Sequence, residues 1–368
     1  MNGRKQKTDI RERRKENMKK EEILRKVGHM SQVAEVRRIS FGEGRAAGMK
    51  GWQVQNGPLE FTVMEDKCLD LAQVIYKGIQ MNFLSKPGIQ GRNHYDTNGG
   101  EAQRSIMGGM MFTSGLENIC APYESDKAYP MHGRIRTTPA EHTGVNTQWT
   151  GDFYEMSLQG EMREAELFGE NLLLKRKITT MYPGKKIFIE DVIENQGFRE
   201  EPAMLLYHFN VGYPLLDKGS RIILPTKKVI PRDEAAAPYV ENYHVMEEPK
   251  DNEPEYVFLH KLAADEEGNT FAAVINENLG LGIRLEFNQK ELPYFMEWKS
   301  LASGDYVVGL EPANSSVYGR AYHEERGDLH TIPSFAAEKK HLTITILEGK
   351  ELQETVKLAE KLVRTTDK

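Results

Sequence analysis

Residues 171–197, NLLLKRKITTMYPGKKIFIEDVIENQG, decide the fold. Two runs rich in Ile, Leu, Phe and Thr flank the pair Pro183-Gly184. Such runs are typical of β-strands, and a Pro-Gly pair between them is typical of a tight turn. The stretch therefore predicts a β-hairpin, the smallest unit of an antiparallel sheet.

The same pattern recurs from Ala34 onward, where short runs rich in Val, Ile, Phe, Tyr and Thr are broken by Gly, Asn, Asp and Pro. Further runs of this kind lie at residues 52–65, 270–288 and 341–349. No internal repeat, Gly/Ser linker or low-complexity block marks a domain boundary. We therefore expect an all-β fold, in which residues 31–368 form one large antiparallel β-sandwich.

The two ends of the chain have a different pattern. Residues 1–30 are predicted to be a basic N-terminal extension with a short helix, because basic and acidic residues alternate around sparse apolar positions and Gly28 suits a helix end. Near the other end, residues 351–363 have helical periodicity. This periodicity predicts a closing helix or a frayed tail.

Composition and charge exclude several classes of protein. The 368-residue chain has a formal net charge of −6, and its basic excess lies in the first stretch, so a nucleic-acid-binding face on the main body is not expected. No stretch approaches the roughly 20 apolar residues that cross a membrane, and the basic start lacks the apolar run of an export signal. Cys68 and Cys120 are far apart and form no CxxC pair, which favours a reducing compartment and hence a cytoplasmic protein.

Three local clusters could carry chemistry, and the first is Met131-His132-Gly133-Arg134. A histidine and an arginine flank a glycine, and a glycine lets the backbone approach a ligand closely. The alternative is a structural histidine at a strand end in a hairpin loop. The cluster alone does not decide between these interpretations.

The second cluster is LLYHFNVGYPLL, residues 205–216. On a strand, His208 and Asn210 project to one face, and Tyr207 and Phe209 project to the other. His208 and Asn210 then either face a cleft as a polar pair, or His208 is a histidine of the core with its hydrogen bonds satisfied.

The third cluster lies in MEWKSLASGDYVVGLEPANS, residues 296–315. Glu311 follows the apolar run Tyr306–Leu310 directly. A carboxylate at the end of a buried strand loses solvation, and its raised pKa makes it a better base near neutral pH. An ordinary surface glutamate at a strand end is the alternative.

Other site types have less support. The sequence has no G-x-S-x-G elbow, no P-loop and no dinucleotide fingerprint after a strand. His132 has no histidine neighbour at the short spacing of a metal site, and we interpret His323 and His330 as loop residues. We therefore predict that the protein uses neither a metal nor a cofactor.

Taken in order, the three clusters resemble the layout of the aldose 1-epimerase family, and specifically an uncharacterised branch of the galactose mutarotase-like superfamily. His132-Gly133 resembles the family's first histidine, and His208-Phe209-Asn210 echoes its H-x-x-F-N signature in compressed form. Residues 310–314, LEPAN, resemble its late L-E-x-x-N segment. The likeness runs from about Ser31 to Gly349 and so covers nearly the whole chain.

Branch-level features add to this resemblance, and one departure limits it. The features are GGMMFTSGLENICAPY at 108–123, CLDLAQVIYKG at 68–78 and VIPRDEAA at 229–236. Ordinary mutarotases have an arginine-rich segment where this chain has Gly115-Leu116-Glu117-Asn118. The sugar contacts that arginine makes there cannot be carried over to this chain.

The resemblance implies a supersandwich whose concave face binds a pyranose, and it implies an isomerase that interconverts α and β anomers. Glu311 would be the base at the C1 hydroxyl. His208, entering protonated, would be the acid at the ring oxygen. His132 would hydrogen-bond the substrate and share the ring-oxygen role.

Further residues are predicted to contact the substrate, which would be a monosaccharide or a sugar derivative. Arg134 would supply the missing cation, and Trp298 and Phe295 would supply an apolar surface on which the sugar stacks. The other predicted contacts are Asn118, Asn210, Arg232 and Asp233. A homodimer is left open, and the alternative function is that of a non-catalytic carbohydrate-binding protein with the same fold.

Overall fold

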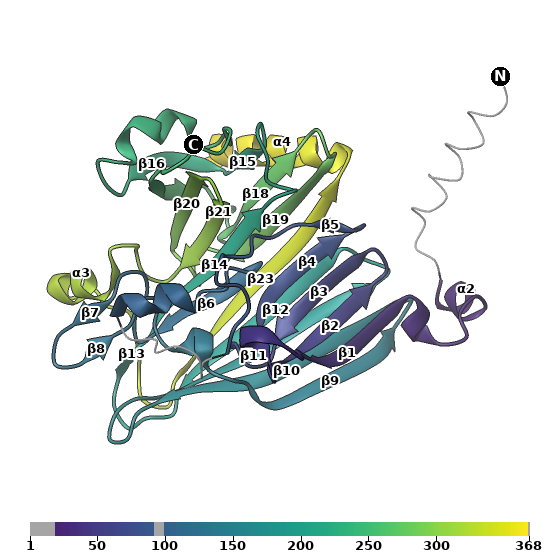
Figure 1. Cartoon of the computed structure of the whole chain (residues 1–368), viewed down its shortest axis with the longest axis horizontal. Helices are drawn as coiled ribbons and strands as arrows, with labels where there is room; N and C mark the ends of the chain where they lie inside the picture. The colour runs from purple at the N-terminus through teal and green to yellow at the C-terminus, as the bar shows by residue number, and fades with distance from the viewer. Residues whose placement is uncertain (1–18, 92–98, 367–368) are drawn as a thin grey trace.

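The computed structural model describes residues 19–91 and 99–366 and has two large antiparallel sheets (Figure 1). The eleven-stranded sheet has, in spatial order, β1 (Ala34–Ser40), β2 (Lys50–Asn56), β3 (Leu59–Met64), β4 (Asp70–Tyr76), β6 (Met111–Leu116), β14 (Met204–Gly212), β21 (Asp305–Ala313), β20 (Tyr294–Ala302), β17 (Glu255–Leu262) and β16 (Thr226–Pro231), with β5 (Ile79–Gln80) paired to β4. This arrangement confirms the all-β prediction.

The eight-stranded sheet forms the second layer. Its order is β15 (Arg221–Ile223), β18 (Asn269–Asn276), β19 (Leu281–Asn288), β23 (Ala337–Glu348), β12 (Lys186–Asn195), β11 (Asn171–Tyr182), β10 (Phe153–Ala165) and β9 (Glu141–Thr150). Two short pairs complete the described strands: β7 (Tyr123–Glu124) with β8 (Ala128–Tyr129), and β13 (Glu201–Pro202) with β22 (Thr331–Ile332).

The hairpin predicted at residues 171–197 is present as β11 and β12. Ile178 pairs with Ile189 across it, and the turn lies at the predicted Pro183-Gly184. The runs at 52–65 and 270–288 likewise form the hairpins β2–β3 and β18–β19. Local turn residues and strand-forming runs therefore determined these pairings correctly.

The core lies between the two sheets, and a charged cluster around Arg176 lies among its apolar side chains. Ile178 and Ile189 of the eight-stranded sheet belong to the same buried cluster as Tyr207, Phe209 and Leu310 of the other sheet. Arg176 is also completely buried there. Its guanidinium contacts Asp191 through Nε (2.9 Å) and Nη2 (2.7 Å), and Nη1 lies 2.8 Å from Asp70 Oδ1.

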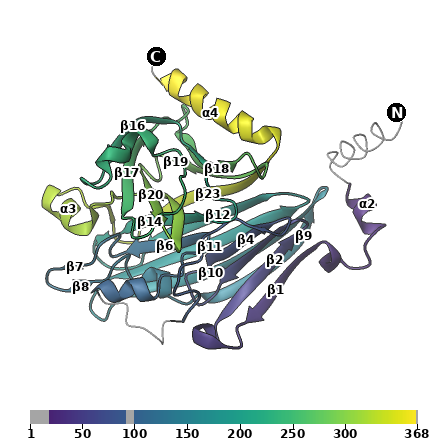
Figure 2. The same cartoon turned by 45° about the horizontal axis from the view of Figure 1, so that its top comes forward.

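The helices lie at the ends and edges of the sandwich. Residues near the C-terminus form a helix, α4 (Lys350–Thr366). Of the two predictions for this segment, the closing helix is therefore correct and the frayed tail is not. Leu352 and Ala359 bury against Phe271 of β18, and α4 lies along the outside of the sandwich (Figure 2). Within the described residues, no helix is both long enough and apolar enough to span a membrane.

At the N-terminus, the structure describes only the second part of the predicted helical segment. This part contains α2 (Lys20–Leu24), and the predicted extension before Lys19 lies outside the described residues. A further helix, α3 (Gly319–Arg326), was not predicted. His323 belongs to α3, is buried and accepts from the backbone N–H of Ser316 (3.0 Å), so its interpretation as a loop residue was wrong.

Candidate active site

Four neighbouring strands, β6, β14, β21 and β20, bring remote parts of the sequence together in the eleven-stranded sheet. On β14, Tyr207 and Phe209 point into the core between the sheets. His208 and Asn210 therefore point to the opposite face, as the alternation along a strand predicts. This outer face of the four strands carries the candidate site.

His208 and Glu311 meet across β14 and β21. Phe209 pairs with Leu310, which places His208 opposite Glu311 on the outer face. His208 Nε2 lies 3.0 Å from Glu311 Oε1, and both side chains are buried. The two atoms are not aligned as a hydrogen bond, so Glu311 Oε1 has no hydrogen-bond partner among the described residues. His208 Nδ1, the other ring nitrogen, has none there either. Unpaired polar atoms at this depth are uncommon and fit a ligand site.

Burial controls the protonation of this pair. Burial raises the pKa of Glu311 to about 8, with the Glu255 charge adding to the effect and the Arg232 charge opposing it. Burial also lowers the pKa of His208 to about 3, although the neighbouring Asn210 amide acts in the other direction. The expectation that His208 enters protonated is therefore wrong for the unliganded site, because desolvation disfavours the imidazolium and Glu311 is itself protonated at neutral pH.

His132 reaches the same site from the turn after β8. Its ring lies edge-on to His208, with the centroids 5.7 Å apart, and its Nδ1 lies 2.9 Å from Ser114 Oγ. No protein partner holds its Nε2 among the described residues. Burial, followed by the charges of His208 and Arg136, holds the pKa of His132 well below its ordinary value, so the ring is neutral at neutral pH.

Gly133 is required by the path of this turn. The residue has φ +67°, and a Cβ there would lie 1.9 Å from the Gly115 carbonyl oxygen. No side chain fits at such a distance. The glycine therefore lets one backbone segment pack against another, whereas the sequence suggested that it admits a ligand.

Aromatic rings frame the histidine. Phe112 of β6 stacks on His208 with the ring centroids 4.4 Å apart, and Trp298 of β20 lies edge-on to His208 at 5.3 Å. Phe295 lies on the other face of β20, in the core, where it stacks on Phe287. Trp298 is thus at the site, and the proposed sugar-stacking role of Phe295 was wrong.

Arg232 and Asp233 lie at the rim of the site. Arg232 is connected to Trp298 through Glu255, and Asp233 contacts Arg232. Trp298 Nε1 donates to Glu255 Oε2 (2.8 Å), and Arg232 Nη2 lies 3.1 Å from Glu255 Oε1. Arg232 Nε also donates to Asp233 Oδ2 (2.7 Å). Glu255 therefore joins the predicted residues Arg232 and Trp298.

The other predicted contact residues have structural partners. Arg134 pairs with Glu117 and donates to the Ala128 carbonyl (3.1 Å). The Asn118 amide donates to the carbonyls of Ala121 and Pro130, at 2.9 Å each. These contacts hold the loops around His132, and neither side chain joins the pair of His208 and Glu311.

The Asn210 amide is held by its own strand region. It donates to the carbonyls of His208 (2.9 Å) and Gly109 (3.2 Å), which leaves its buried Oδ1 without a hydrogen-bond partner. Asn210 is therefore part of the site, and its Oδ1 is the atom that could accept a hydrogen bond from a ligand.

Four residues of this site were not predicted from the sequence: Phe112, Ser114, Glu255 and Gly309. Gly309 is the one that alternation could have found, because it lies two residues before Glu311 on the same face. A Cβ at this position would lie 2.7 Å from Glu311 Oε1 and 3.2 Å from His208 Cε1. The missing side chain therefore keeps open the space beside the reactive pair.

Metal ligation has no geometric support in residues 19–91 and 99–366. No group of three His, Cys, Asp or Glu side chains there converges as metal ligands would. The groups next to one another at the centre of the site are the Glu311 carboxyl and the imidazoles of His132 and His208, with aromatic rings around them.

Solved structures share this architecture. A candidate aldose 1-epimerase from Klebsiella pneumoniae superposes with a TM-score of 0.85 at 22% identity, over 89% of this chain and 87% of that one. A galactose mutarotase-like protein from Clostridium acetobutylicum gives 0.58 at 12% identity, over 86% and 99%. Galactose 1-epimerase from Lactobacillus acidophilus gives 0.55 at 11% identity, over 86% and 99%. These identities establish the galactose mutarotase-like fold alone.

Sequence comparisons place the chain in a family. Comparison with curated proteins gives no match. The family model described as a domain of unknown function, DUF4432, matches residues 46–346, which include His132, His208 and Glu311. This chain therefore belongs to the DUF4432 family.

Proposed function

We propose that this protein interconverts the α and β anomers of an aldose or a sugar derivative by acid–base ring opening. The observation that carries the proposal is the buried contact between His208 Nε2 and Glu311 Oε1, 3.0 Å long, on the outer face of the sheet. Two titratable groups with oppositely shifted pKa values are the arrangement that acid–base catalysis requires.

Anomer exchange needs one group that takes a proton and one that gives a proton. The C1 hydroxyl loses its proton while the ring oxygen gains one, so that the C1–O bond of the ring breaks and an open-chain aldehyde forms. After rotation about the bond between C1 and C2, the same steps in reverse close the ring on the other face of C1. Two side chains that share one proton can perform both directions.

The pair of Glu311 and His208 holds one proton at neutral pH. With pKa values of about 8 and about 3, the proton resides on Glu311 in the empty site, and His208 is neutral. For Glu311 to act as the base, the proton passes to His208 across 3.0 Å when the sugar binds. In the reverse assignment, Glu311 protonates the ring oxygen and His208 is the base. Both assignments use the same total number of protons.

The surroundings suit a sugar ring. Trp298 offers an aromatic surface beside His208, and its indole is oriented by the hydrogen bond to Glu255. His132 Nε2 and Asn210 Oδ1 have no hydrogen-bond partner in the described part of the chain, so both can hydrogen-bond hydroxyl groups. The similar structures named as aldose or galactose 1-epimerases support the same class of reaction.

The test removes the titrating groups with little change of shape. Glu311→Gln and His208→Asn should each slow α-to-β exchange, measured by NMR on a panel of sugars, by at least ~100-fold, because proton transfer by a positioned group contributes about 10²–10⁴-fold. Sugar affinity, measured by calorimetry, should change little. Glu190→Gln and His341→Asn, on the eight-stranded sheet, are the matched controls and should leave both quantities unchanged.

Each outcome has a clear meaning. An unaltered exchange rate in Glu311→Gln would overturn the mechanism. A wild-type protein that binds a sugar but never accelerates exchange would identify a non-catalytic carbohydrate-binding protein. The cytoplasmic location, the absence of a cofactor and the homodimer stay predictions.

A further inference from the structure

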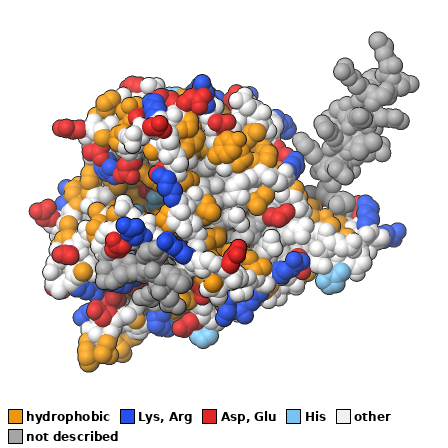
Figure 3. Space-filling model, viewed as in Figure 1, with side chains coloured by type: hydrophobic (Ala, Val, Ile, Leu, Met, Phe, Trp, Pro, Cys, Tyr) orange, Lys and Arg blue, Asp and Glu red, His pale blue; other side chains and the backbone are white. Residues whose placement is uncertain are grey.

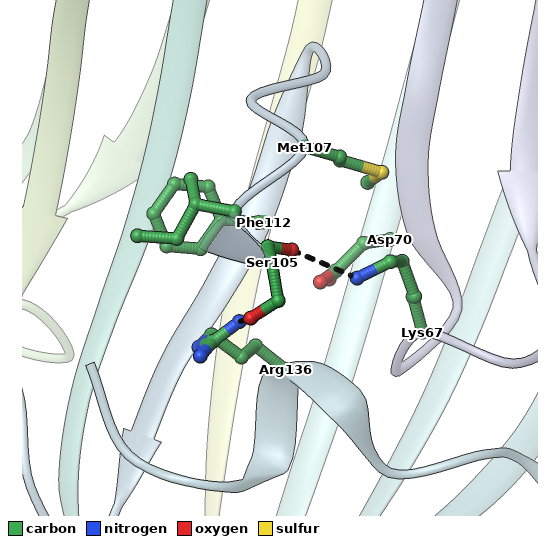
Figure 4. A pocket seen from close by; sticks show the side chains of 7 residues that line it. Lys67, Asp70, Ser105, Met107, Phe112 and Arg136 are labelled. Carbon is green, nitrogen blue, oxygen red and sulfur yellow. Dashed lines mark hydrogen bonds between the residues drawn. The ribbon is translucent and has the colours of Figure 1, made fainter. Parts of the chain in front are cut away.

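A small cavity beside Phe112 contains two buried cations. Figure 4 shows Lys67 and Arg136 converging near Ser105, next to the Phe112 ring. Arg136 Nη1 donates to Ser105 Oγ (3.0 Å), and Lys67 Nζ donates to the Ser105 carbonyl (3.3 Å). Each of the two residues is only 3% exposed. Buried cations without a carboxylate partner are rare, because desolvation of the charge is costly.

Arg136 has an unused hydrogen-bonding edge. Its Nε and Nη2 are buried, and neither has a hydrogen-bond partner in the part of the chain that the structure describes. These two nitrogens form one side of the planar guanidinium, and that side fits the two oxygens of a carboxylate or a phosphoryl group. Arg176 uses this same edge in the core, where Nε and Nη2 hold both oxygens of Asp191. Arg136 thus lacks the acidic partner that Arg176 has.

Within residues 19–91 and 99–366, no carboxylate pairs with Arg136 or Lys67. Asp70 also lines the cavity, but its oxygens are occupied by Arg176 and Thr113. Together with Asp191, the buried cluster has two carboxylates against the three cations Lys67, Arg136 and Arg176. Burial and the Arg136 charge lower the pKa of Lys67 to about 8, and burial lowers the pKa of Arg136 to about 10. A bound anion would relieve both effects.

The cavity adjoins the candidate active site. Phe112 lines the cavity and also stacks on His208, so one aromatic ring separates the two cations from the imidazole. The Arg136 charge also contributes to the lowered pKa of His132. A substituent of a bound sugar whose anomeric carbon lies between His208 and Glu311 would therefore have to pass the Phe112 ring to enter this cavity.

We propose that Arg136 and Lys67 form a subsite for an acidic group of the substrate, so that the protein acts on an anionic sugar, a sugar acid or a sugar phosphate, in preference to a neutral hexose. Arg136 binds two oxygens of the acidic group through Nε and Nη2, and Lys67 adds the second positive charge. This inference rests on the proposed function, because it places the anomeric carbon of that sugar at His208 and Glu311.

The experiment compares the binding of glucuronate, glucose 6-phosphate and glucose to the full-length protein by calorimetry. The wild-type protein should bind at least one of the two anionic sugars ~10-fold or more tightly than glucose. Arg136→Gln and Lys67→Met should each lower the affinity for that anionic sugar by roughly 10- to 100-fold, because hydrogen bonds between charged groups contribute more to the binding free energy than those between neutral groups. Their glucose affinity should stay within about twofold. Arg104→Gln removes an exposed cation of the neighbouring segment and should change nothing.

Preference for glucuronate would identify a carboxylate subsite, and preference for glucose 6-phosphate a phosphate subsite. Should Arg136→Gln fail to fold, Lys67→Met and competition by inorganic phosphate in the wild type still decide the question. Glucose binding as tight as that of both anions, or an anion preference that survives both substitutions, would overturn the inference. Anomer exchange by NMR separates the two proposals: exchange of a neutral sugar without anion preference rejects only the subsite, and anion binding without exchange rejects only the catalysis.

Discussion

Burial, more than any neighbouring charge, determines how Glu311 behaves, and the effect should be visible in stability. The ordinary pKa of a glutamate is 4.5, and that of Glu311 is raised to about 8. Between these pH values the unfolded chain loses this proton and the folded chain keeps it. Rising pH therefore lowers the free energy of unfolding of the wild type through this group.

Glu311→Gln should remove this loss, because glutamine does not titrate. The variant should gain stability relative to the wild type as the pH rises from about 4.5 to 8, by up to a few kcal/mol, and the gain should level off above that. Urea unfolding at pH 5, 6, 7 and 8 measures the difference. A difference that is the same at every pH would mean that the folded and unfolded pKa values are alike.

The same shift predicts the pH dependence of the reaction. The pair must hold one proton, so kcat/KM for anomer exchange should be flat across neutral pH and fall as Glu311 ionises above about 8. Both assignments of acid and base give this profile. The lowered pKa of Lys67 lies in the same range, so the profile should be repeated in Lys67→Met with glucose as the substrate. A rate that rises through pH 8 would contradict the one-proton pair.

Gly309→Ala tests the space beside the pair without touching a titrating group. The added methyl group would lie 2.7 Å from Glu311 Oε1 and 3.2 Å from His208 Cε1, so it must displace the reactive atoms. We expect anomer exchange to fall at least ~10-fold, with a loss of stability of about 1–3 kcal/mol, as for overpacking. Gly144→Ala, whose Cβ would meet its nearest neighbour at 3.9 Å, is the control. Full activity in Gly309→Ala would show that ligands do not use this space.

At the scale of elements, the turn after β8 positions His132 through its glycine. Gly133 and Gly151 have similar φ values, +67° and +62°. A Cβ at Gly133 would lie 1.9 Å from the Gly115 carbonyl oxygen, and a Cβ at Gly151 would meet nothing within 4 Å. Substitution at Gly151 therefore measures the cost of a side chain at positive φ alone, and substitution at Gly133 measures that cost together with the clash against the Gly115 carbonyl.

Gly151→Ala should cost about 1 kcal/mol, as expected for a positive φ alone. Gly133→Ala should cost at least ~3 kcal/mol and move His132, with a loss of exchange activity. Chemical denaturation and NMR exchange measure the two effects. Equal stability losses in the two variants would contradict the packing argument.

The sequence patterns predicted individual strands and hairpins well, but they did not predict which distant strands lie side by side in the sheet. Local turn residues and strand-forming runs were enough for the β11–β12 hairpin, and alternation placed His208 and Asn210 on one face. The sequence could not show that β6 lies next to β14, because that contact joins segments about 90 residues apart and depends on the packing of the whole sheet. Phe112 and Ser114 were therefore missed.

The turn after β8 shows the same limit at closer range. Arg134 was selected because it adjoins His132-Gly133, but the short helix η5 (Ile135–Thr137) places Arg136 in the cavity, and Arg134 pairs with Glu117. The choice between two arginines that are two residues apart depends on the path of the turn. That path is set by contacts with Gly115, which the local sequence does not contain.

At the scale of the whole molecule, charges are arranged differently outside and inside. The face shown in Figure 3 has acidic and basic side chains interspersed. Inside, Arg176 of the eight-stranded sheet bonds Asp70 and Thr113 of the eleven-stranded sheet as well as Asp191 of its own sheet. This cluster is a buried polar link between two layers that also meet through many apolar side chains.

Arg176→Met should therefore destabilise the whole sandwich. Removing one partner of a buried ion pair leaves uncompensated charge, here on Asp70 and Asp191, and costs about 3–5 kcal/mol. Lys177→Met is the control, because Lys177 is 43% exposed and lies 4.0 Å from Glu190, and pairs of this kind contribute about 0–1 kcal/mol. Urea unfolding followed by fluorescence and by circular dichroism measures both variants.

The pH dependence of this loss identifies its cause. Burial raises the pKa of Asp70 to about 6 even with Arg176 present, and without the arginine it must rise further. Protonated carboxyl groups need no counter-charge, so the destabilisation in Arg176→Met should be smaller at pH 5 than at pH 8. A loss of equal size at both pH values would mean that Arg176 stabilises the sandwich through packing of its side chain, and that the charges of Asp70 and Asp191 are not what the arginine offsets.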